Sequence, residues 1–263
     1  DQSAADGDIM AAGAVAVKRS FDAVNLSLGQ RGSSADNLAD YFSVLTRMKN
    51  ALGGFLLVLA SAGNAGPFDR TLSQPGAGVD VIAVAAATKS KDDKKPEIAF
   101  YSSVGPDLDR RFSERRLRLK PDLTAIGGDV ISEPGSRNVY RFGVFSARSK
   151  DAARAESDLE DGRHTGMSGT SMASPSAAAI ALLVKLAVRV AGAGTPFVEE
   201  NLAFAVKAVL MRSAGDLGVP MWFQGAGLIR EIKPAAQIVQ EMMRDAERIL
   251  TGYAAPAAKA ARI

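Results

Sequence analysis

Runs of consecutive apolar residues alternate along the chain with segments in which apolar residues recur every three or four positions. The uninterrupted runs have the length of strands, and we expect strands over 23–29, 55–60, 79–85, 98–103 and 120–128. The helical spacing predicts helices over 7–20, 35–51 and 198–211, and 231–251 is amphipathic. Strands that are apolar on both faces are typical of parallel sheets covered by helices. We therefore expect an α/β fold with a mainly parallel sheet.

A stretch of small residues, Ser168-Gly169-Thr170-Ser171-Met172-Ala173-Ser174-Pro175, leads directly into a strongly apolar helix. Proline is tolerated in a first helical turn, because its missing N–H has no intrahelical partner there, so we expect the helix to begin near Thr170 or Ser171. Ser171 then lies at a helix N-terminus, where free N–H groups favour the negative charge that acyl transfer places beside a serine nucleophile. The other interpretation is an ordinary N-cap, worth roughly 1 kcal/mol.

Composition narrows the class of protein. With 263 residues, of which 47% are hydrophobic and 23% charged, we expect one domain over 1–250 and a frayed, low-complexity tail over 251–263. The net charge of +3 is too small to indicate nucleic acid or an anionic membrane surface as a partner. No cysteine and one histidine exclude thiol catalysis and Cys-based or His-rich metal sites, and the compartment stays unknown.

Two further features concern membranes and the solvated surface. The apolar runs are shorter than the roughly 18 residues of a membrane span, and no signal-peptide pattern occurs, so we expect neither a transmembrane segment nor a leader in this chain. Since it begins at Asp1, we expect a processed product or one piece of something longer.

The basic stretch 110–120 predicts a solvated helix or loop, with a phosphate or acidic-partner site as the alternative. Segment 139–162 has a weak pattern and predicts an exposed insertion.

The stretch from Ser168 to Pro175 resembles the serine motif of the subtilisin-like proteases, the subtilases. Four more landmarks of that family follow its order in this chain, at 24–29, 61–66, 101–106 with 120–125, and 224–229. The five together cover about residues 7–235, and the loop after Asn64 and the ending at Gln224-Gly225 look most like the tripeptidyl peptidase branch. The resemblance implies a three-layer subtilisin-like fold that hydrolyses peptide bonds of a polypeptide substrate through an acyl-enzyme on Ser171.

The same resemblance implies roles for the residues around Ser171. Asn64 is expected to donate its amide to the oxyanion beside the backbone N–H of Ser171, although an Asn before Gly is also an ordinary turn residue. Ser73 aligns with the base of the specificity pocket, and its neutrality predicts no preference for basic side chains. The expected substrate-binding residues are Ser27, Leu28, Gly29, Ala62, Gly63 and Ser73. No cofactor is expected; the family resemblance leaves calcium open, and the sequence identifies no metal site.

The histidine and aspartate of a serine-protease triad are missing from this pattern. In subtilases both precede every segment present here, and neither motif occurs in this chain. The single histidine, His164, lies on a strand leading to Ser171, roughly 20 Å away if extended, so we expect a surface histidine and not the base. Either another chain or an omitted N-terminal segment supplies both groups, or the protein is a silent pseudoprotease acting as a binding or scaffold protein. The intact serine-side landmarks favour the first, with a fold incomplete at its N-terminal side and apolar faces left uncovered.

Overall fold

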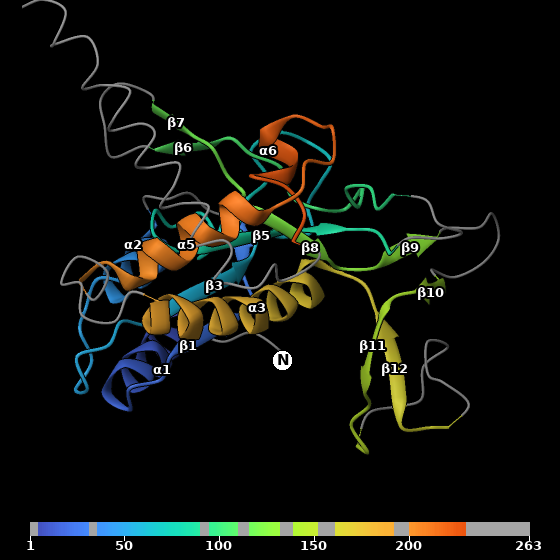
Figure 1. The fold of residues 1–263 in the computed structure, drawn as a ribbon. Helices are drawn as coiled ribbons and strands as arrows, with labels where there is room; N and C mark the ends of the chain where they lie inside the picture. Colours follow the sequence, from blue (N-terminus) through green and yellow to red (C-terminus); the bar gives the residue numbers. More distant parts are fainter. Residues whose placement is uncertain are drawn as a thin grey trace, which may run out of the picture.

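A four-stranded parallel sheet forms the centre of the computed structural model, which describes residues 5–31, 36–89, 95–109, 116–131, 139–151, 161–191 and 200–229. In spatial order its strands are β1 (Ala23–Leu26), β3 (Leu57–Ser61), β5 (Ile82–Ala87) and β8 (Leu123–Ile126) (Figure 1). All residues of β3 and β5 are buried, as the uninterrupted apolar runs predict. The expected parallel α/β sheet is confirmed.

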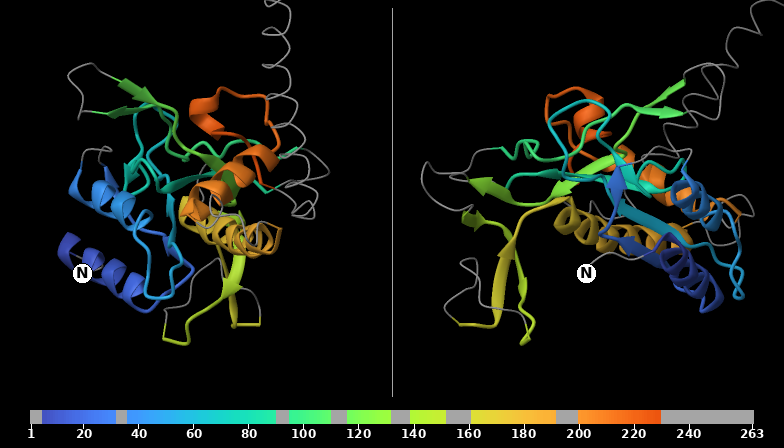
Figure 2. Two further views of the ribbon diagram at one scale, coloured as in Figure 1. Left: turned by 60° about the vertical axis from the view of Figure 1, so that its left-hand side comes forward. Right: turned by 180° about the vertical axis from the view of Figure 1, so that it is seen from behind.

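Helices cover both faces of this sheet, so the fold has three layers (Figure 2). The helices of one layer are α1 (Asp6–Lys18) and α2 (Asn37–Leu45), and those of the other are α3 (Thr170–Ala191) and α5 (Leu202–Ser213). Side chains alternate along β3, so that Leu57 and Leu59 pack in the core beneath α3 whereas Val58 packs in the core with Phe42 of α2. Both faces of the sheet therefore need a helical cover, which explains why its strands are apolar throughout.

Four pairs of short antiparallel strands surround the central sheet. They are β2 (Gln30–Arg31) with β4 (Ser73–Gln74), β6 (Asp107–Asp109) with β7 (Arg116–Arg118), β9 (Asp129–Ile131) with β10 (Val139–Phe142), and β11 (Val144–Ala147) with β12 (His164–Met167). The β11–β12 hairpin projects from the body beside the start of α3 (Figure 1). Within the segment 139–162, expected to be an exposed insertion, residues 139–142 and 144–147 thus form strands, and 152–160 lie outside the described residues.

Three sequence expectations differ from the structure at the ends of elements. The segment 98–103 forms one isolated bridge, Ile98 to Ala87, and otherwise a partly buried loop, because the hydroxyl of Ser102 accepts the N–H of Ala86 in place of a strand partner. The helix expected over 35–51 ends at Leu45, before a turn in which the side chain of Asn50 accepts two backbone N–H groups. The turn at 223–229 follows a short helix, α6 (Met221–Gln224). The segment 231–251 and the tail 251–263 lie outside the described residues.

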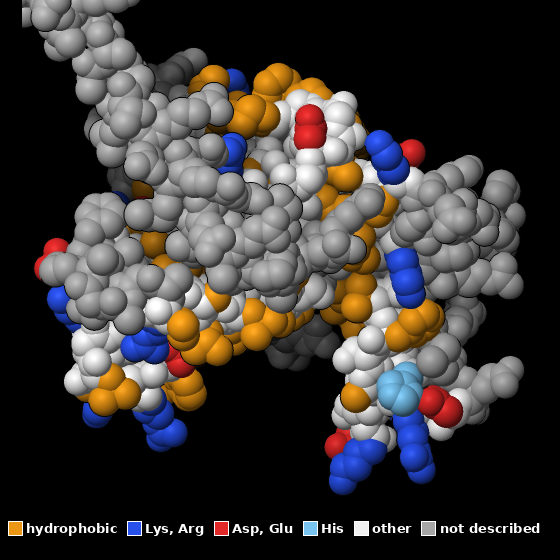
Figure 3. Space-filling model, in the orientation of Figure 1, with side chains coloured by type: hydrophobic (Ala, Val, Ile, Leu, Met, Phe, Trp, Pro, Cys, Tyr) orange, Lys and Arg blue, Asp and Glu red, His pale blue; other side chains and the backbone are white. Residues whose placement is uncertain are grey.

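Helix α3 has apolar side chains on all of its sides. Its buried side packs on all four strands of the sheet, and 44% of its most apolar window is buried, so a helix long and apolar enough to cross a membrane serves here as the core helix. Its outer side carries an exposed apolar stripe of Leu182, Leu183, Leu186 and Val190 (Figure 3). A helix that is apolar all round is normally covered on every side. The stripe is therefore an apolar face that the described residues leave exposed.

Lys120 overturns part of the expectation for the basic stretch 110–120. Its side chain is only 2% exposed, and its ammonium group donates to the carbonyl of Val81 and to Oδ2 of Asp122, each at 2.7 Å. Lys207 of α5 binds Oδ1 of the same carboxylate at 2.7 Å. Burial lowers the pKa of Lys120 to about 8, although Asp122 opposes this. Burial alone would raise the pKa of Asp122, but the two ammonium groups hold it below its ordinary value. Lys120 is thus a structural ion-pair residue and not part of a solvated surface.

Candidate active site

The residues that the sequence predicts for catalysis and substrate binding lie at one edge of the molecule. The four central strands are parallel, so their carboxyl ends meet at the same edge of the sheet, where open α/β sheets usually bind ligands. The loop after β1 carries Ser27, and the loop after β3 carries Asn64. Ser171 is the second residue of α3, whose N-terminus lies at this edge through the contacts described next. Residues more than a hundred positions apart in the sequence are thus brought together.

Pro175 explains how the loop after β1 is tied to the nucleophile candidate. It lies in the second turn of α3 and not in the first turn as expected, so its missing N–H leaves the carbonyl of Ser171 without its usual helical partner. The hydroxyl of Ser27 donates to that carbonyl at 2.8 Å. The proline therefore creates an acceptor at the start of the helix that a side chain of the neighbouring loop satisfies.

A chain of side-chain hydrogen bonds supports the same contact. The hydroxyl of Ser174 donates to Oδ1 of Asn25 at 2.6 Å, and the amide of Asn25 donates to the hydroxyl of Ser27 at 2.9 Å. Ser174 is fully buried, which fixes one end of this chain. The position of Ser171 relative to β1 is therefore set by three hydrogen bonds in series, and Ser174 is occupied in a structural role.

The amide of Asn64 has a defined orientation beside Ser171. Its Oδ1 accepts the backbone N–H and the hydroxyl of Thr170, both at 2.9 Å, and this hydroxyl accepts the N–H of Gly63 at 3.2 Å. Because a backbone N–H can only donate, the amide oxygen must face Thr170. The amide nitrogen then faces away from Thr170, and it has no hydrogen-bond partner among the described residues. An uncommitted amide donor next to a serine at a helix N-terminus is an arrangement that can stabilise an oxyanion.

The remaining substrate-binding candidates lie close around Asn64. A side chain on Gly63, whose φ is +106°, would collide with the hydroxyl of Ser73, and a Cβ on Gly29 would lie 3.0 Å from the Cβ of Ser73. The backbone N–H of Ser73 donates to the carbonyl of Ala62 at 2.9 Å, and the carbonyl of Leu28 accepts the hydroxyl of Ser61 at 3.4 Å. Ser73 thus fills the space between two glycine backbones.

A buried tyrosine holds the serine loop from the other side. The hydroxyl of Tyr101 donates to the carbonyl groups of Gly127 and Gly128, and the carbonyl of Gly127 also accepts the N–H of Gly169. Burial raises the pKa of Tyr101, and the carboxylate of Asp129 adds to this effect. The hydroxyl therefore stays protonated and keeps its role as a donor.

A cavity of about 540 Å³ opens beside Ser171, between the β11–β12 hairpin and the first turns of α3. Its walls are mainly apolar and include Phe145 and Met167 of the hairpin and Met172 and Pro175 of the helix. No histidine lines it, although the base of an acyl-transfer site must lie within hydrogen-bond reach of the serine.

His164 is placed away from this chemistry, as its position in the sequence indicates. It begins β12, and its Nδ1 lies 2.6 Å from Oδ2 of Asp161, with both side chains about half exposed. The hydrogen bonds that hold this carboxylate come from the backbone N–H groups of Arg163 and His164, so the pair forms a local turn. Within the described residues, no group of three or more His, Cys, Asp or Glu side chains is placed to hold a metal ion.

Comparisons with known proteins agree with the fold and the motif. The model of the subtilase family matches residues 1–228. Subtilisin of Bacillus sp. (strain TA39) is 32% identical over 160 residues, 60% of this chain and 30% of the relative; serine protease AprX of Bacillus subtilis (strain 168) is 30% identical over 168 residues, 62% and 33% respectively. The chain thus spans about a third of the length of these curated relatives.

Solved structures show the same similarity of fold. A lanthipeptide protease superimposes with a TM-score of 0.60 at 22% identity, over 92% of this chain and 68% of that one. The prenylagaramide maturation protease PagA superimposes with a TM-score of 0.59 at 20% identity, over 90% and 70%. These likenesses establish the subtilisin-like three-layer fold. Because the family model covers most of its length, the chain belongs to the subtilase family of serine proteases.

Proposed function

We propose that this chain is the serine-bearing part of a peptidase in which Ser171 is the nucleophile and Asn64 is a donor to the oxyanion. The observation that carries the proposal is the amide of Asn64, which Thr170 orients through two hydrogen bonds beside the serine. The triad histidine and aspartate come from another chain or from a segment outside this sequence, because its single histidine is bound to Asp161 in the hairpin turn.

The reaction follows from these positions. The supplied histidine removes the proton of the Ser171 hydroxyl while Oγ attacks the carbonyl carbon of the scissile peptide bond. The carbonyl oxygen becomes an oxyanion, which accepts hydrogen bonds from the Asn64 amide and from the backbone N–H of Ser171. The C–N bond then breaks, the histidine returns the proton to the leaving amine, and water hydrolyses the resulting ester on Ser171 by the reverse sequence.

Three features support an additional body of protein that supplies the base. The cavity beside Ser171 has apolar walls, the exposed apolar stripe lies on the same helix as Ser171, and among the described strands β1 pairs within the central sheet with β3 alone. An open strand edge beside an uncovered apolar helix favours the docking of further strands and helices. The chain also spans only about a third of its curated relatives.

A fluorophosphonate probe tests the proposal. In the assembled enzyme, Ser171 should react within minutes, whereas Ser168 and Ser174 should not, because no base lies beside them and Ser174 already donates to Asn25. The isolated 263-residue chain should label slowly at best. Native mass analysis should show the reactive species to contain protein in addition to this chain. Rapid labelling of the isolated chain that His164→Ala abolishes would contradict the assignment, and an assembled enzyme that never labels would favour the pseudoprotease.

Ser73 leads to a prediction on specificity. Its side chain fills the space between Gly29 and Gly63, so the pocket for the residue before the scissile bond should be shallow and uncharged. We expect cleavage after small neutral residues, and Ser73→Gly should raise kcat/KM for a large apolar residue at that position by about tenfold. Peptide libraries measure both, with Ser149→Gly, an exposed serine after β11, as a matched control. Strong cleavage after Lys or Arg would show that Ser73 is not at the base of the pocket.

A further inference from the structure

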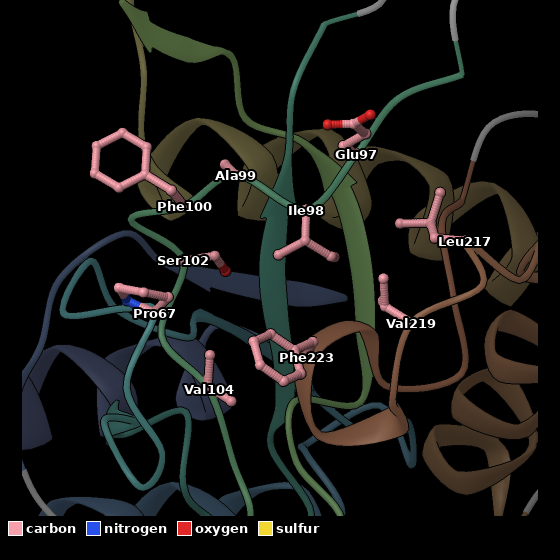
Figure 4. A pocket seen from close by; sticks show the side chains of 10 residues that line it. All are labelled: Pro67, Glu97, Ile98, Ala99, Phe100, Ser102, Val104, Leu217, Val219 and Phe223. Atoms are coloured by element: carbon pink, nitrogen blue, oxygen red, sulfur yellow. The ribbon is translucent and has the colours of Figure 1, made fainter. Parts of the chain in front are cut away.

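A second cavity of about 410 Å³ lies behind the loop that carries Asn64, and it shares no residue with the candidate active site. Three segments form its walls: Pro67, the loop 97–104 and the turn 217–223 that ends in α6 (Figure 4). Ile98 and Phe223 point toward one another across it, with Val219 beside them (Figure 4). Its volume lies within the range of about 300–1,000 Å³ of small-molecule sites.

The chemistry of the walls limits what can bind. The lining side chains are almost all apolar, and the hydroxyl of Ser102 is already hydrogen-bonded to the N–H of Ala86. Glu97 is the one charged residue among them, and in the part of the chain that the structure describes its carboxylate has no ion-pair partner. An apolar cavity with a single unpaired anion at its margin fits a compact apolar molecule that carries one positive charge.

The loop 97–104 is also bonded to both halves of the candidate active site. Toward Asn64, the carbonyl of Tyr101 accepts the N–H of Gly66, and Ser103 binds Gly63 and Ala65 through its N–H and its hydroxyl. Toward Ser171, the hydroxyl of Tyr101 holds the carbonyl groups of Gly127 and Gly128. A molecule that packs against this loop can therefore shift, through these hydrogen bonds, the backbone that positions the oxyanion donor and the nucleophile.

We propose that this cavity is a regulatory site for a small organic amine, whose aromatic or branched apolar body fills the space between Ile98, Val219 and Phe223 while its ammonium group pairs with Glu97. Occupancy of the cavity changes the reactivity of Ser171 through the loop 97–104. The second statement rests on the proposed function, whereas the binding itself does not.

Calorimetric titration of the chain in its native assembly with tryptamine tests the binding. Indole-3-propionate has the same apolar body with the opposite charge, and tryptamine should bind at least about fivefold more tightly. Val219→Phe should weaken tryptamine at least about tenfold by filling the cavity, and Glu97→Gln should remove the preference between the two probes. Glu200→Gln, at an exposed carboxylate two residues before α5, is the matched control and should change neither affinity. Equal affinities in the wild type, or unchanged binding in Val219→Phe, would overturn the proposal.

The regulatory part needs its own measurement. Saturating tryptamine should change the rate of fluorophosphonate labelling at Ser171 at least about twofold in the wild type and leave Val219→Phe unaffected. Binding in the cavity with an unchanged labelling rate would overturn the coupling. If Ser171 never labels, with or without tryptamine, the proposed function fails, and the titration still decides the cavity.

Discussion

Asn64→Ala is expected to lower the turnover of the assembled enzyme by about 10²–10³-fold, equivalent to about 2.7–4 kcal/mol of transition-state stabilisation. The substitution removes an amide donor whose position Thr170 fixes, and no other side-chain donor among the described residues takes its place. Because the developing oxyanion needs this donor more than the ground-state carbonyl does, kcat should fall while KM changes little. Steady-state kinetics with a peptide substrate measures the split.

Thr170→Val is the matched variant for this prediction. It keeps the hydrogen bond from the backbone N–H to Asn64 and removes only the one from the hydroxyl. The amide of Asn64 is then oriented by one hydrogen bond instead of two, and kcat should fall by about tenfold. Asn64 is exposed, but its replacement leaves the N–H of the buried Thr170 without an acceptor, so the free energy of unfolding should fall by about 1–3 kcal/mol, and turnover is measured well below the midpoint of thermal unfolding. A fall in kcat of less than about fivefold with Asn64→Ala would mean that Asn64 is only a turn residue.

The candidate site was largely predictable from the sequence because the residues that indicate it lie in short, continuous motifs. The motif around Ser171 combines small residues, a proline and an apolar helix within a few positions, and the parallel sheet then brings the loops after β1 and β3 to the same edge. The motif does not show why a proline is tolerated in the second turn of the helix. The carbonyl of Ser171, which the proline leaves without a helical partner, accepts the hydroxyl of Ser27, 144 residues away in sequence. Thr170 was missed for the same reason, although it lies within the motif.

Long-range polar contacts were not predictable in the same way. A run of basic residues is normally solvated, so Lys120 gave no signal of burial, and the second ammonium group on the carboxylate of Asp122 comes from Lys207 of α5, far away in sequence. The loop 98–103 shows the converse error, because Ala99 and Tyr101 are buried in it without belonging to a strand. The spacing of apolar residues predicts burial, but it does not predict which partners the backbone N–H and carbonyl groups of a buried segment have.

Asp122→Ala is expected to destabilise the fold by about 3–5 kcal/mol, because it leaves the buried ammonium group of Lys120 without its counter-ion. The carboxylate is 5% exposed, binds both Lys120 and Lys207 at 2.7 Å, and accepts the N–H of Ala83 at 2.7 Å. The cost is that of an uncompensated buried charge and not the net value of the ion pair. Chemical denaturation measures it, and Asp80→Ala, which breaks an ion pair with the exposed Arg47, is the control and should cost less than about 1 kcal/mol.

The pH dependence of this destabilisation should identify Lys120 as its source. Burial lowers the pKa of Lys120 to about 8 in the folded state, so above pH 8 and up to its ordinary value of 10.5 the unfolded chain binds more protons, and stability from this group rises with pH. Without the opposing carboxylate, the pKa of Lys120 falls further, so the variant regains stability from a lower pH than the wild type. The difference in unfolding free energy should therefore be smaller at pH 9 than at pH 7. A difference that is the same at both values would mean that Lys120 is not the charge left unpaired.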